Sequence, residues 1–312
     1  MPLVTVIIPN YNHGAYLRER IESVIHQTFT DIEIILIDDC STDNSQEIIR
    51  EYQHHPKVRF VFLNATNSGS PYSHWPMALQ LANADWIWVA ESDDLSDPEF
   101  LEKLYPLALQ DPQNSMAYCD TVILETTDID SPTLYSGIKN KRYGTAKWSH
   151  AYQQDGKAEL NEYLKKDCTI NNVSAVLFRK TFAMDVVKTF SGFRFHGDWI
   201  FYIRMAEKGR ITYLPEPLNQ YREHAGNHSK IVSGNHFNKP ECFHILQYLL
   251  QQDYISGKKE LTHHFIREYI GFGLWQDKPF LANGIFRTYW EKDWKLSLRV
   301  LYRLLINKII PG

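Results

Sequence analysis

The segment WIWVAESDD, residues 86–94, places three acidic side chains directly after an apolar run. The run from Trp86 to Ala90 has the length and composition of a buried strand. Three carboxylates at its end would repel one another strongly unless a cation or hydrogen-bond donors were present. Carboxylate oxygens suit Mg²⁺ or Mn²⁺, and open α/β sheets bind ligands at this end of their strands. The segment therefore predicts either a divalent-metal site or a solvated acidic turn before a helix that starts near Pro98.

Strand and helix patterns alternate through the first half of the chain. Apolar, β-branched runs at 3–8, 33–37 and 58–63 predict strands, and the patterns at 17–25, 45–52 and 77–82 predict helices between them. This alternation indicates an α/β fold with a largely parallel sheet. Asp38 and Asp39 end the second strand, so we expect them at the same sheet edge as residues 91–94. Neither a G-x-G-x-x-G turn nor a P-loop motif occurs, which argues against an ordinary dinucleotide or ATP site.

The second half of the chain predicts a smaller α+β region followed by helices. Strands are expected at 117–124 and 173–178, helices at 180–187 and from Asp198 to Gly209, and a further strand through Tyr213. The stretch 125–155 has no clear periodicity and is expected to be a loop. Helical patterns then follow near 237–255, 258–275 and 293–309.

Composition and charge argue against several classes of function. The chain has 312 residues and a formal net charge of −4, and no Lys/Arg stripe precedes its last predicted helix, so we expect no nucleic-acid partner. Its four cysteines are too widely spaced for a zinc knuckle or a disulfide framework, which suits a reducing cytoplasm. The chain starts directly with a strand pattern and has no apolar run of spanning length, so we expect neither secretion nor a transmembrane segment.

The last predicted helix, residues 294–308, combines an apolar stripe with four basic side chains, Lys295, Arg299, Arg303 and Lys308. Basic amphipathic helices of this kind can lie on the anionic inner face of a membrane. The same pattern also suits a helix packed on the rest of the chain or on a second copy in a homodimer. The sequence leaves both interpretations open.

Three ordered motifs carry a family resemblance: VIIPNYN at 6–12, SVIHQTF at 23–29 and IDDCSTD at 37–43. Together they closely resemble the nucleotide-binding half of family 2 glycosyltransferases, whose fold is called GT-A. The resemblance covers roughly the first 230 residues, and several ordered motifs make chance agreement improbable. It implies a catalytic domain at 1–232, with a nucleotide-sugar half at 1–115 and an acceptor half at 116–232, followed by a helical region at 233–312. The loop at 125–155 is then expected to contact the acceptor.

The resemblance implies that residues of several strand-end turns bind the nucleotide of a UDP-sugar: Pro9, Asn10, Tyr11, Asp39, Asn67, Gly69 and Ser92. In the family, the acid that matches Asp39 hydrogen-bonds the uracil ring. A carboxylate accepts from the ring N–H, which is the edge that distinguishes uracil from cytosine. The alternative for Asp38 and Asp39 is a helix-cap cluster together with Ser41 and Asp43.

The acidic segment resembles the metal motif of this family, usually Asp-x-Asp followed by a third Asp. Asp93 is then expected to bind a Mg²⁺ or Mn²⁺ ion directly, with Asp94 as the third acid. Glu91 replaces the first Asp, and its longer side chain is expected to reach the ribose or a metal-bound water. His224 stands at a motif position that closes the donor site, where it binds either the metal or a donor phosphate, or has a structural role.

The segment 195–204 resembles the family's Glu-Asp motif, with Asp198 at the Asp position and Gly197 where Glu often stands. We expect Asp198 to be the catalytic base, which accepts the proton of the attacking hydroxyl. The alternative is an N-cap for its own helix, because Asp is among the preferred caps.

These features imply an inverting, metal-dependent glycosyltransferase that moves a hexosyl or N-acetylhexosaminyl group from a nucleotide donor. The expected acceptor is a saccharide or lipid-linked saccharide hydroxyl in surface polysaccharide synthesis. A sugar-nucleotidyltransferase is the first alternative, but it should carry a Gly-rich basic turn in place of residues 9–12. A non-catalytic saccharide-binding protein is the second, although it would not need the full set of acids.

Overall fold

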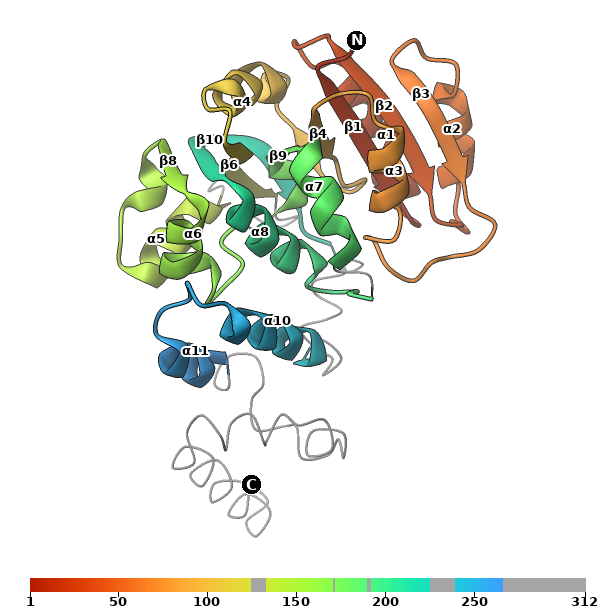
Figure 1. Ribbon diagram of the computed structural model, residues 1–312. Helices are drawn as coiled ribbons and strands as arrows, with labels where there is room; N and C mark the ends of the chain where they lie inside the picture. Colours follow the sequence, from red (N-terminus) through yellow and green to blue (C-terminus); the bar gives the residue numbers. More distant parts are fainter. Residues whose placement is uncertain (125–132, 171, 190–191, 225–238, 266–312) are drawn as a thin grey trace. The chain divides into compact units, whose positions relative to one another are not determined.

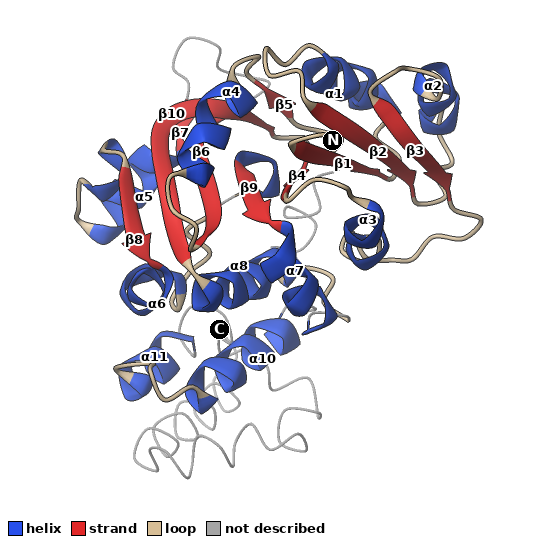
Figure 2. Cartoon of the chain, turned by 45° about the horizontal axis from the view of Figure 1, so that its top comes forward, coloured by secondary structure: helices blue, strands red, loops and turns tan. Residues whose placement is uncertain are grey.

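The computed structural model describes residues 1–124, 133–170, 172–189, 192–224 and 239–265, and the chain divides into two compact units, Met1–Ile231 and Val232–Gly312. In the first unit, ten of the described segments pair in one sheet (Figures 1 and 2). The strands are β1 Val4–Asn10, β2 Ile32–Asp38, β3 Val58–Leu63, β4 Trp86–Val89, β5 Leu95–Ser96, β6 Asn114–Leu124, β7 Thr133–Leu134, β8 Tyr152–Asp155, β9 Val176–Arg179 and β10 Arg210–Arg222.

The helices of the first unit are α1 Gly14–Ile25, α2 Ser45–Tyr52, α3 Trp75–Leu81, α4 Phe100–Leu109, α5 Tyr135–Tyr143, α6 Gly156–Glu159, α7 Lys180–Val186 and α8 Gly197–Lys208. Short 3₁₀ or π turns lie at Lys147–Ser149, Leu160–Leu164, Val173–Ala175 and Val187–Thr189. The sheet order is β3-β2-β1-β4-β9-β6-β10-β5, with β7 paired to β6 and β8 paired to β10. The expected α/β fold with a mostly parallel sheet is confirmed, because β3, β2, β1 and β4 are parallel, as are β6 and β10.

Both faces of the parallel part of the sheet are covered, which explains why β1, β2 and β4 are continuous apolar runs in the sequence. On one face, alternate residues of these strands form a core with α1, α2 and α4. On the other face lies α3, whose Trp75 stacks on Phe178 of β9 with ring centroids 6.0 Å apart (Figure 2). The residues of β1, β2 and β4 are therefore buried along the whole length of these strands.

The ends of three strands meet at one edge of this sheet. Asn10 pairs with Asp38, and the amide of Ala90 donates to the carbonyl of Ile7, so β1 lies between the two acidic strand ends. The strand β10 returns to the same edge, where the amide of Arg222 donates to Asp94. The expectation that both acidic turns share one edge is thus confirmed.

The expectation of a loop throughout 125–155 is wrong, because residues 133–155 contain β7, α5 and β8. The sequence does not predict the helix α5, because its buried side chains are Ser136 and Lys139 and it therefore has no apolar stripe. Burial of Lys139 is compensated by the rings of Tyr118 and Trp148, whose centroids lie 5.5 and 5.1 Å from its Nζ. Residues 125–132 lie outside the described residues.

In the second unit, α10 Lys239–Gln251 and α11 Lys258–Phe265 fall within the first two predicted helical blocks. The third block, with the basic helix at 294–308, lies outside the described residues. None of the helices within the described ranges is both long and apolar enough to span a membrane. All four cysteines are free, as expected.

Candidate active site

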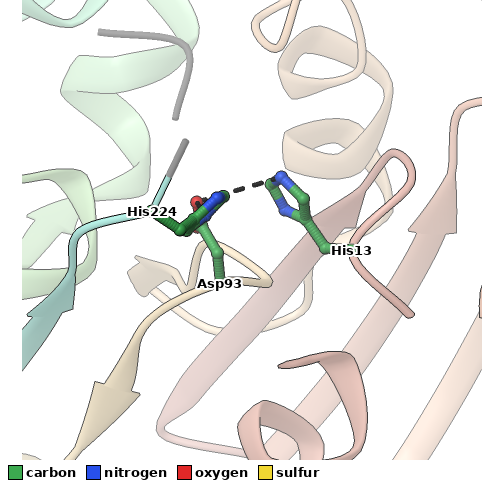
Figure 3. Close-up of side chains that lie close together, drawn as sticks. All are labelled: His13, Asp93 and His224. Carbon is green, nitrogen blue, oxygen red and sulfur yellow. Dashed lines mark hydrogen bonds and ion pairs between the residues drawn. The ribbon is translucent and has the colours of Figure 1, made fainter. Parts of the chain in front are cut away.

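Three side chains from distant parts of the chain meet beyond the end of β4 (Figure 3). Asp93 lies in the turn between β4 and β5, His224 follows β10, and His13 directly precedes α1. The Nε2 atom of His224 lies 3.2 Å from Oδ2 of Asp93, and Nε2 of His13 lies 3.9 Å from the same oxygen. The ligand atoms of the three residues all lie within 4.8 Å of one another, a spacing that one metal ion can bridge.

The other acids of this turn surround the cluster without belonging to it. Asp94 is fully buried and accepts from Asn172 Nδ2 at 2.9 Å and from Ser174 Oγ at 2.6 Å. The side chain of Glu91 is in none of these contacts, although its amide donates to Ser174 Oγ. The structure therefore separates the three acids: Asp93 faces the two histidines, and Asp94 faces the opposite wall of the turn.

Charge accumulates in this turn. Burial raises the pKa of Glu91 well above its usual range, and the charges of Asp93 and Asp94 raise it further. Burial, with Asp93 close by, also raises the pKa of Asp94 to about 6. Burial alone would raise the pKa of Asp93 too, but the hydrogen bond with His224 and the nearby His13 outweigh it and lower this pKa. Three carboxylates in one buried turn therefore repel one another, which favours a cation at the site.

Part of the compensating charge comes from Arg20, which is fully buried on α1. Its Nε donates to the carbonyl of Glu91 at 2.9 Å, and its guanidinium lies 5.2 Å from the Trp88 ring centroid. Burial lowers the pKa of Arg20 to about 10, so the side chain remains charged at neutral pH. Arg20 therefore stabilises the acidic turn through the main-chain carbonyl of Glu91, whereas the Asp93 carboxylate lies beside the two histidines.

The second acidic turn, after β2, is rich in hydrogen-bond donors. Asp38 is completely buried and accepts from three side chains, Asn10, Ser41 and Gln46. Asp39 accepts from Asn64 and from the amide and hydroxyl of Ser68, and its Oδ1 lies 3.0 Å from Nε2 of His74. Burial raises the pKa of Asp39, but the bonds from Asn64 and Ser68 outweigh this effect and hold the pKa below its usual value.

The other nucleotide residues expected from the sequence gather around this turn. Pro9 and Asn10 end β1 and are buried, whereas Tyr11 beyond them is 45% exposed and free to contact a ligand. Asn67 donates to the carbonyl of Asp39 and accepts from the amide of Gly69, which has a φ of +72°. Asn10 and Asn67 thus shape the turns, and Tyr11 presents an open face. Ser92, by contrast, bonds His13 Nδ1 at 2.8 Å.

Asp198 lies in the first turn of α8, but it is not the N-cap, because that position is His196. Its Oδ1 accepts from the amide of Trp199 at 2.8 Å and lies 3.4 Å from the hydroxyl of Tyr72. A Cβ atom at Gly197 would lie 2.5 Å from the Tyr72 ring. The ring of Tyr72 therefore fills the space in which a larger side chain at position 197 would stand.

Three residues that sequence reasoning missed contribute to the site: His13, His74 and Arg20. Each of these residues has a sequence position that weakly indicates a role in the site. His13 follows the first strand-end turn, His74 precedes a helix of the nucleotide half, and Arg20 stands three residues after Leu17 on the apolar stripe of α1. A basic side chain on an otherwise apolar stripe is expected to have a buried partner.

The fold, with two acidic turns at the carboxyl ends of its parallel strands, is that of a GT-A domain. The model of the family described as "Glycosyl transferase family 2" matches residues 5–184, more than half of the chain, so the chain belongs to this family. The resemblance drawn from the three motifs is thereby confirmed.

Among curated proteins, an uncharacterized glycosyltransferase of Haemophilus influenzae is 37% identical over 151 residues, which covers 45% of this chain and 60% of that protein. The poly(ribitol-phosphate) beta-N-acetylglucosaminyltransferase TarS of Staphylococcus aureus is 34% identical over 100 residues, or 31% of this chain and 17% of TarS. The matched segments thus span less than two thirds of either relative.

Several solved structures share the fold, of which two are informative here. The structure of S. aureus TarS 1-349 in complex with UDP-GlcNAc has a TM-score of 0.62 at 20% identity and covers 90% of this chain and 75% of that chain. The mannosyltransferase PcManGT of Pyrobaculum calidifontis, in complex with GDP-Man and Mn²⁺, has a TM-score of 0.52 at 13% identity. This match covers 99% of this chain and 87% of that chain.

Proposed function

We propose that this family 2 member is an inverting, metal-dependent glycosyltransferase that uses a UDP-linked sugar. The observation that carries the proposal is the pair of Asp93 and His224, 3.2 Å apart, at the sheet edge that also holds Asp39. Such an edge suits a ligand with a base at one end and a charged diphosphate at the other. The neighbours complexed with UDP-GlcNAc and with GDP-Man and Mn²⁺ support a nucleotide-sugar donor and a divalent ion.

In this proposal the turn after β2 binds the base. Asp39 accepts the uracil N–H, and Tyr11 covers the base and ribose. The Ser68 hydroxyl, which now donates to Asp39, has another acceptor in the carbonyl of Ser70 at 3.1 Å. When the uracil N–H replaces the Ser68 hydroxyl as a donor to Asp39, the hydroxyl can still donate to Ser70. The replacement therefore costs little free energy.

Asp93 and His224 fit a divalent ion such as Mn²⁺ or Mg²⁺. Their ligand atoms converge from two parts of the chain, both side chains are largely buried, and two further carboxyl groups, Glu91 and Asp94, lie in the same turn. The bound ion would offset the negative charge that develops on the departing UDP. Glu91 and Asp94 tune the field at the ion, and Asp94 fixes the turn through Asn172 and Ser174.

Asp198 is the proposed catalytic base. Its charge is among the causes that raise the pKa of Glu91, so the two carboxylates influence one another across the site. Inversion requires the acceptor oxygen to attack on the face opposite to the UDP, and a carboxylate must take its proton there. The amide of Trp199 stabilises the ionised form of Asp198, which is the form that accepts a proton.

The acceptor is proposed from relatives. TarS transfers N-acetylglucosamine to poly(ribitol-phosphate), as its name states, so a hexosyl or N-acetylhexosaminyl donor and a surface-polymer acceptor are the best candidates. The chain would comprise a nucleotide-sugar half at 1–115, an acceptor half at 116–232 and a helical region at 233–312. A lipid-linked acceptor is a further part of the proposal, and for residues 294–308 membrane contact and packing on the chain or in a homodimer remain alternatives.

The test begins with a screen of UDP-, GDP- and TDP-sugars for stabilisation against heat in the presence of Mn²⁺, because a bound donor raises stability by mass action. The sugar that stabilises most is then used to compare wild type with Asp198→Asn. We expect a fall in transfer rate of roughly 100-fold or more with unchanged UDP affinity. Asp185→Asn, at a side chain that is 67% exposed, is the matched control. Normal turnover by Asp198→Asn would exclude the base assignment.

A further inference from the structure

His13 occupies the N-cap position of α1 but forms no side-chain cap bond with the helix. Its ring points instead toward the acidic turn, as Figure 3 shows. The ring of His224 lies edge-on to it, with centroids 5.6 Å apart and an interplanar angle of 88°. Two imidazoles thus approach one carboxylate oxygen of Asp93 from different directions.

The distances between Asp93 Oδ2 and the two histidine Nε2 atoms suit coordination of one metal ion by all three residues. Two atoms bonded to one ion at about 2.1 Å lie no more than about 4.2 Å apart. The Asp93 oxygen is 3.2 Å from His224 Nε2 and 3.9 Å from His13 Nε2, both within that limit, and the whole set falls within 4.8 Å. The largest separation in the set is at most 4.8 Å, about 0.6 Å beyond that limit, so a small movement of one histidine ring toward the others would bring all three ligand atoms within reach of one ion.

The other nitrogen of His13 is already occupied. Nδ1 lies 2.8 Å from the hydroxyl oxygen of Ser92, the residue directly before Asp93. Histidines that bind metals usually have a second hydrogen bond of this kind, which fixes the tautomer and the ring orientation. With the proton on Nδ1 donated to Ser92, the lone pair of Nε2 faces Asp93 and His224.

We propose that His13 is the third protein ligand of the metal site, with Ser92 as its positioning residue, and that the site prefers a transition-metal dication over Mg²⁺. The inference rests on the proposed function and adds a ligand and an ion preference to it. Imidazole nitrogen is a better ligand for transition-metal dications than for Mg²⁺, which prefers oxygen ligands and retained waters; Mn²⁺ is the weakest-binding of these transition metals and is the probe used below. Three protein ligands also hold the ion before the nucleotide arrives and leave the remaining positions for diphosphate oxygens and water.

The experiment measures metal binding by the full chain without any turnover. Metal-free wild type, His13→Ala and His13→Asn are titrated with Mn²⁺ and, separately, with Mg²⁺ by calorimetry. His13→Asn keeps a favourable N-cap for α1 while it removes the imidazole, so a folding defect is distinguished from a lost ligand. His54→Ala changes an exposed histidine and is the matched control.

We expect both His13 variants to bind Mn²⁺ at least about 10- to 100-fold more weakly, the loss found even for changes around metal ligands. Mg²⁺ binding should change less, so the preference for Mn²⁺ falls. Electron spin-echo modulation of bound Mn²⁺ should show two imidazole nitrogens in wild type and His54→Ala, and one in His13→Asn. Unchanged Mn²⁺ affinity or unchanged nitrogen modulation in His13→Asn would overturn the inference.

The same titration separates this inference from the proposed function. If Asp93→Asn and His224→Ala lose Mn²⁺ binding while His13→Asn keeps it, only the third ligand is wrong. If wild type binds no divalent ion with or without UDP, the proposed metal dependence fails and the inference fails with it.

Discussion

The turns after β2 and β4 both place adjacent acids at the end of a buried strand, yet their surroundings differ. After β2, the side chains of Asn64 and Ser68 donate to Asp39, His74 lies close to it, and the pKa of Asp39 is lowered. After β4, burial raises the pKa of both Glu91 and Asp94. Hydrogen-bond donors thus outweigh burial at Asp39, whereas burial outweighs the donors at Asp94.

In the proposed function, this difference separates two ways of binding one nucleotide-sugar. A carboxylate held by neutral donors can read the edge of a base without any ion. A turn with surplus negative charge must acquire a cation before it can approach a diphosphate. The two turns are therefore expected to respond differently to substitution, to metal and to pH.

The largest expected effect belongs to Asp93→Asn. We expect transfer to fall by roughly 1000-fold or more, because a metal ion contributes several kcal/mol of charge stabilisation. The Mn²⁺ dependence of UDP binding should disappear as well, while the melting temperature of the metal-free protein stays near that of wild type. Calorimetry with unchanged Mn²⁺-linked UDP affinity would remove Asp93 from the metal site.

Asp39→Ala tests the turn after β2. UDP binding should weaken by about 1.5 to 3 kcal/mol, the range for a hydrogen bond to a charged group. The loss should be the same with and without Mn²⁺, because this turn needs no ion. An equal loss of affinity for a saccharide that carries no nucleotide would point to misfolding instead.

Asp38→Asn is expected to act on stability. Asp38 is fully buried and accepts from Asn10, Ser41 and Gln46, so an amide in its place leaves some of these donors unpaired. The free energy of unfolding should fall by about 1 to 3 kcal/mol. Urea denaturation measures this loss, and a stability equal to that of wild type would contradict the structural role of Asp38.

The smallest effect concerns pH. The pKa of Asp94, about 6, lies above its usual value, so the folded protein holds this proton more tightly than the unfolded chain. In the metal-free protein the resulting stabilisation is present at low pH and is lost as the pH rises through about 6, by about 1 kcal/mol between pH 5 and 7. Asp94→Asn should lack this slope. Identical pH dependence of unfolding in both proteins would show that Asp94 does not titrate in this range.

Asp39 should contribute a slope of opposite sign. Its pKa is lowered in the folded protein, so its stabilisation is present above the unfolded value and is lost as the pH falls through the folded value. Comparison of Asp39→Ala with wild type below pH 4 measures this contribution.

The framework of the fold was predictable because local patterns and long-range packing agree. The strands β1, β2 and β4 are buried on both faces, so their apolar runs are visible in the sequence. The helix α5 was missed because its inward side chain, Lys139, is paired with aromatic rings instead of belonging to an apolar stripe. Periodicity detects burial only where the buried residues are apolar.

The site was only partly predictable, for a related reason. Strand order brings the two acidic turns to one edge, and the motifs marked Asp39, Asp93 and His224. The contacts of His13 with Ser92 and Asp93 depend on how α1 approaches the turn after β4, which no local pattern encodes. The close approach of Tyr72 to Gly197 likewise joins positions more than a hundred residues apart.

In the proposed function, Asp39 binds the base without a metal ion, whereas the diphosphate binds through the metal ion at Asp93. Calorimetric titration of wild type with UDP and with uridine, each in the presence of chelator and of Mn²⁺, tests this claim most directly. We predict that Mn²⁺ strengthens UDP binding at least about 10-fold, a difference of about 1.4 kcal/mol, and leaves uridine binding unchanged. Equal UDP affinity in chelator and in Mn²⁺, or an equal gain for uridine, would contradict it.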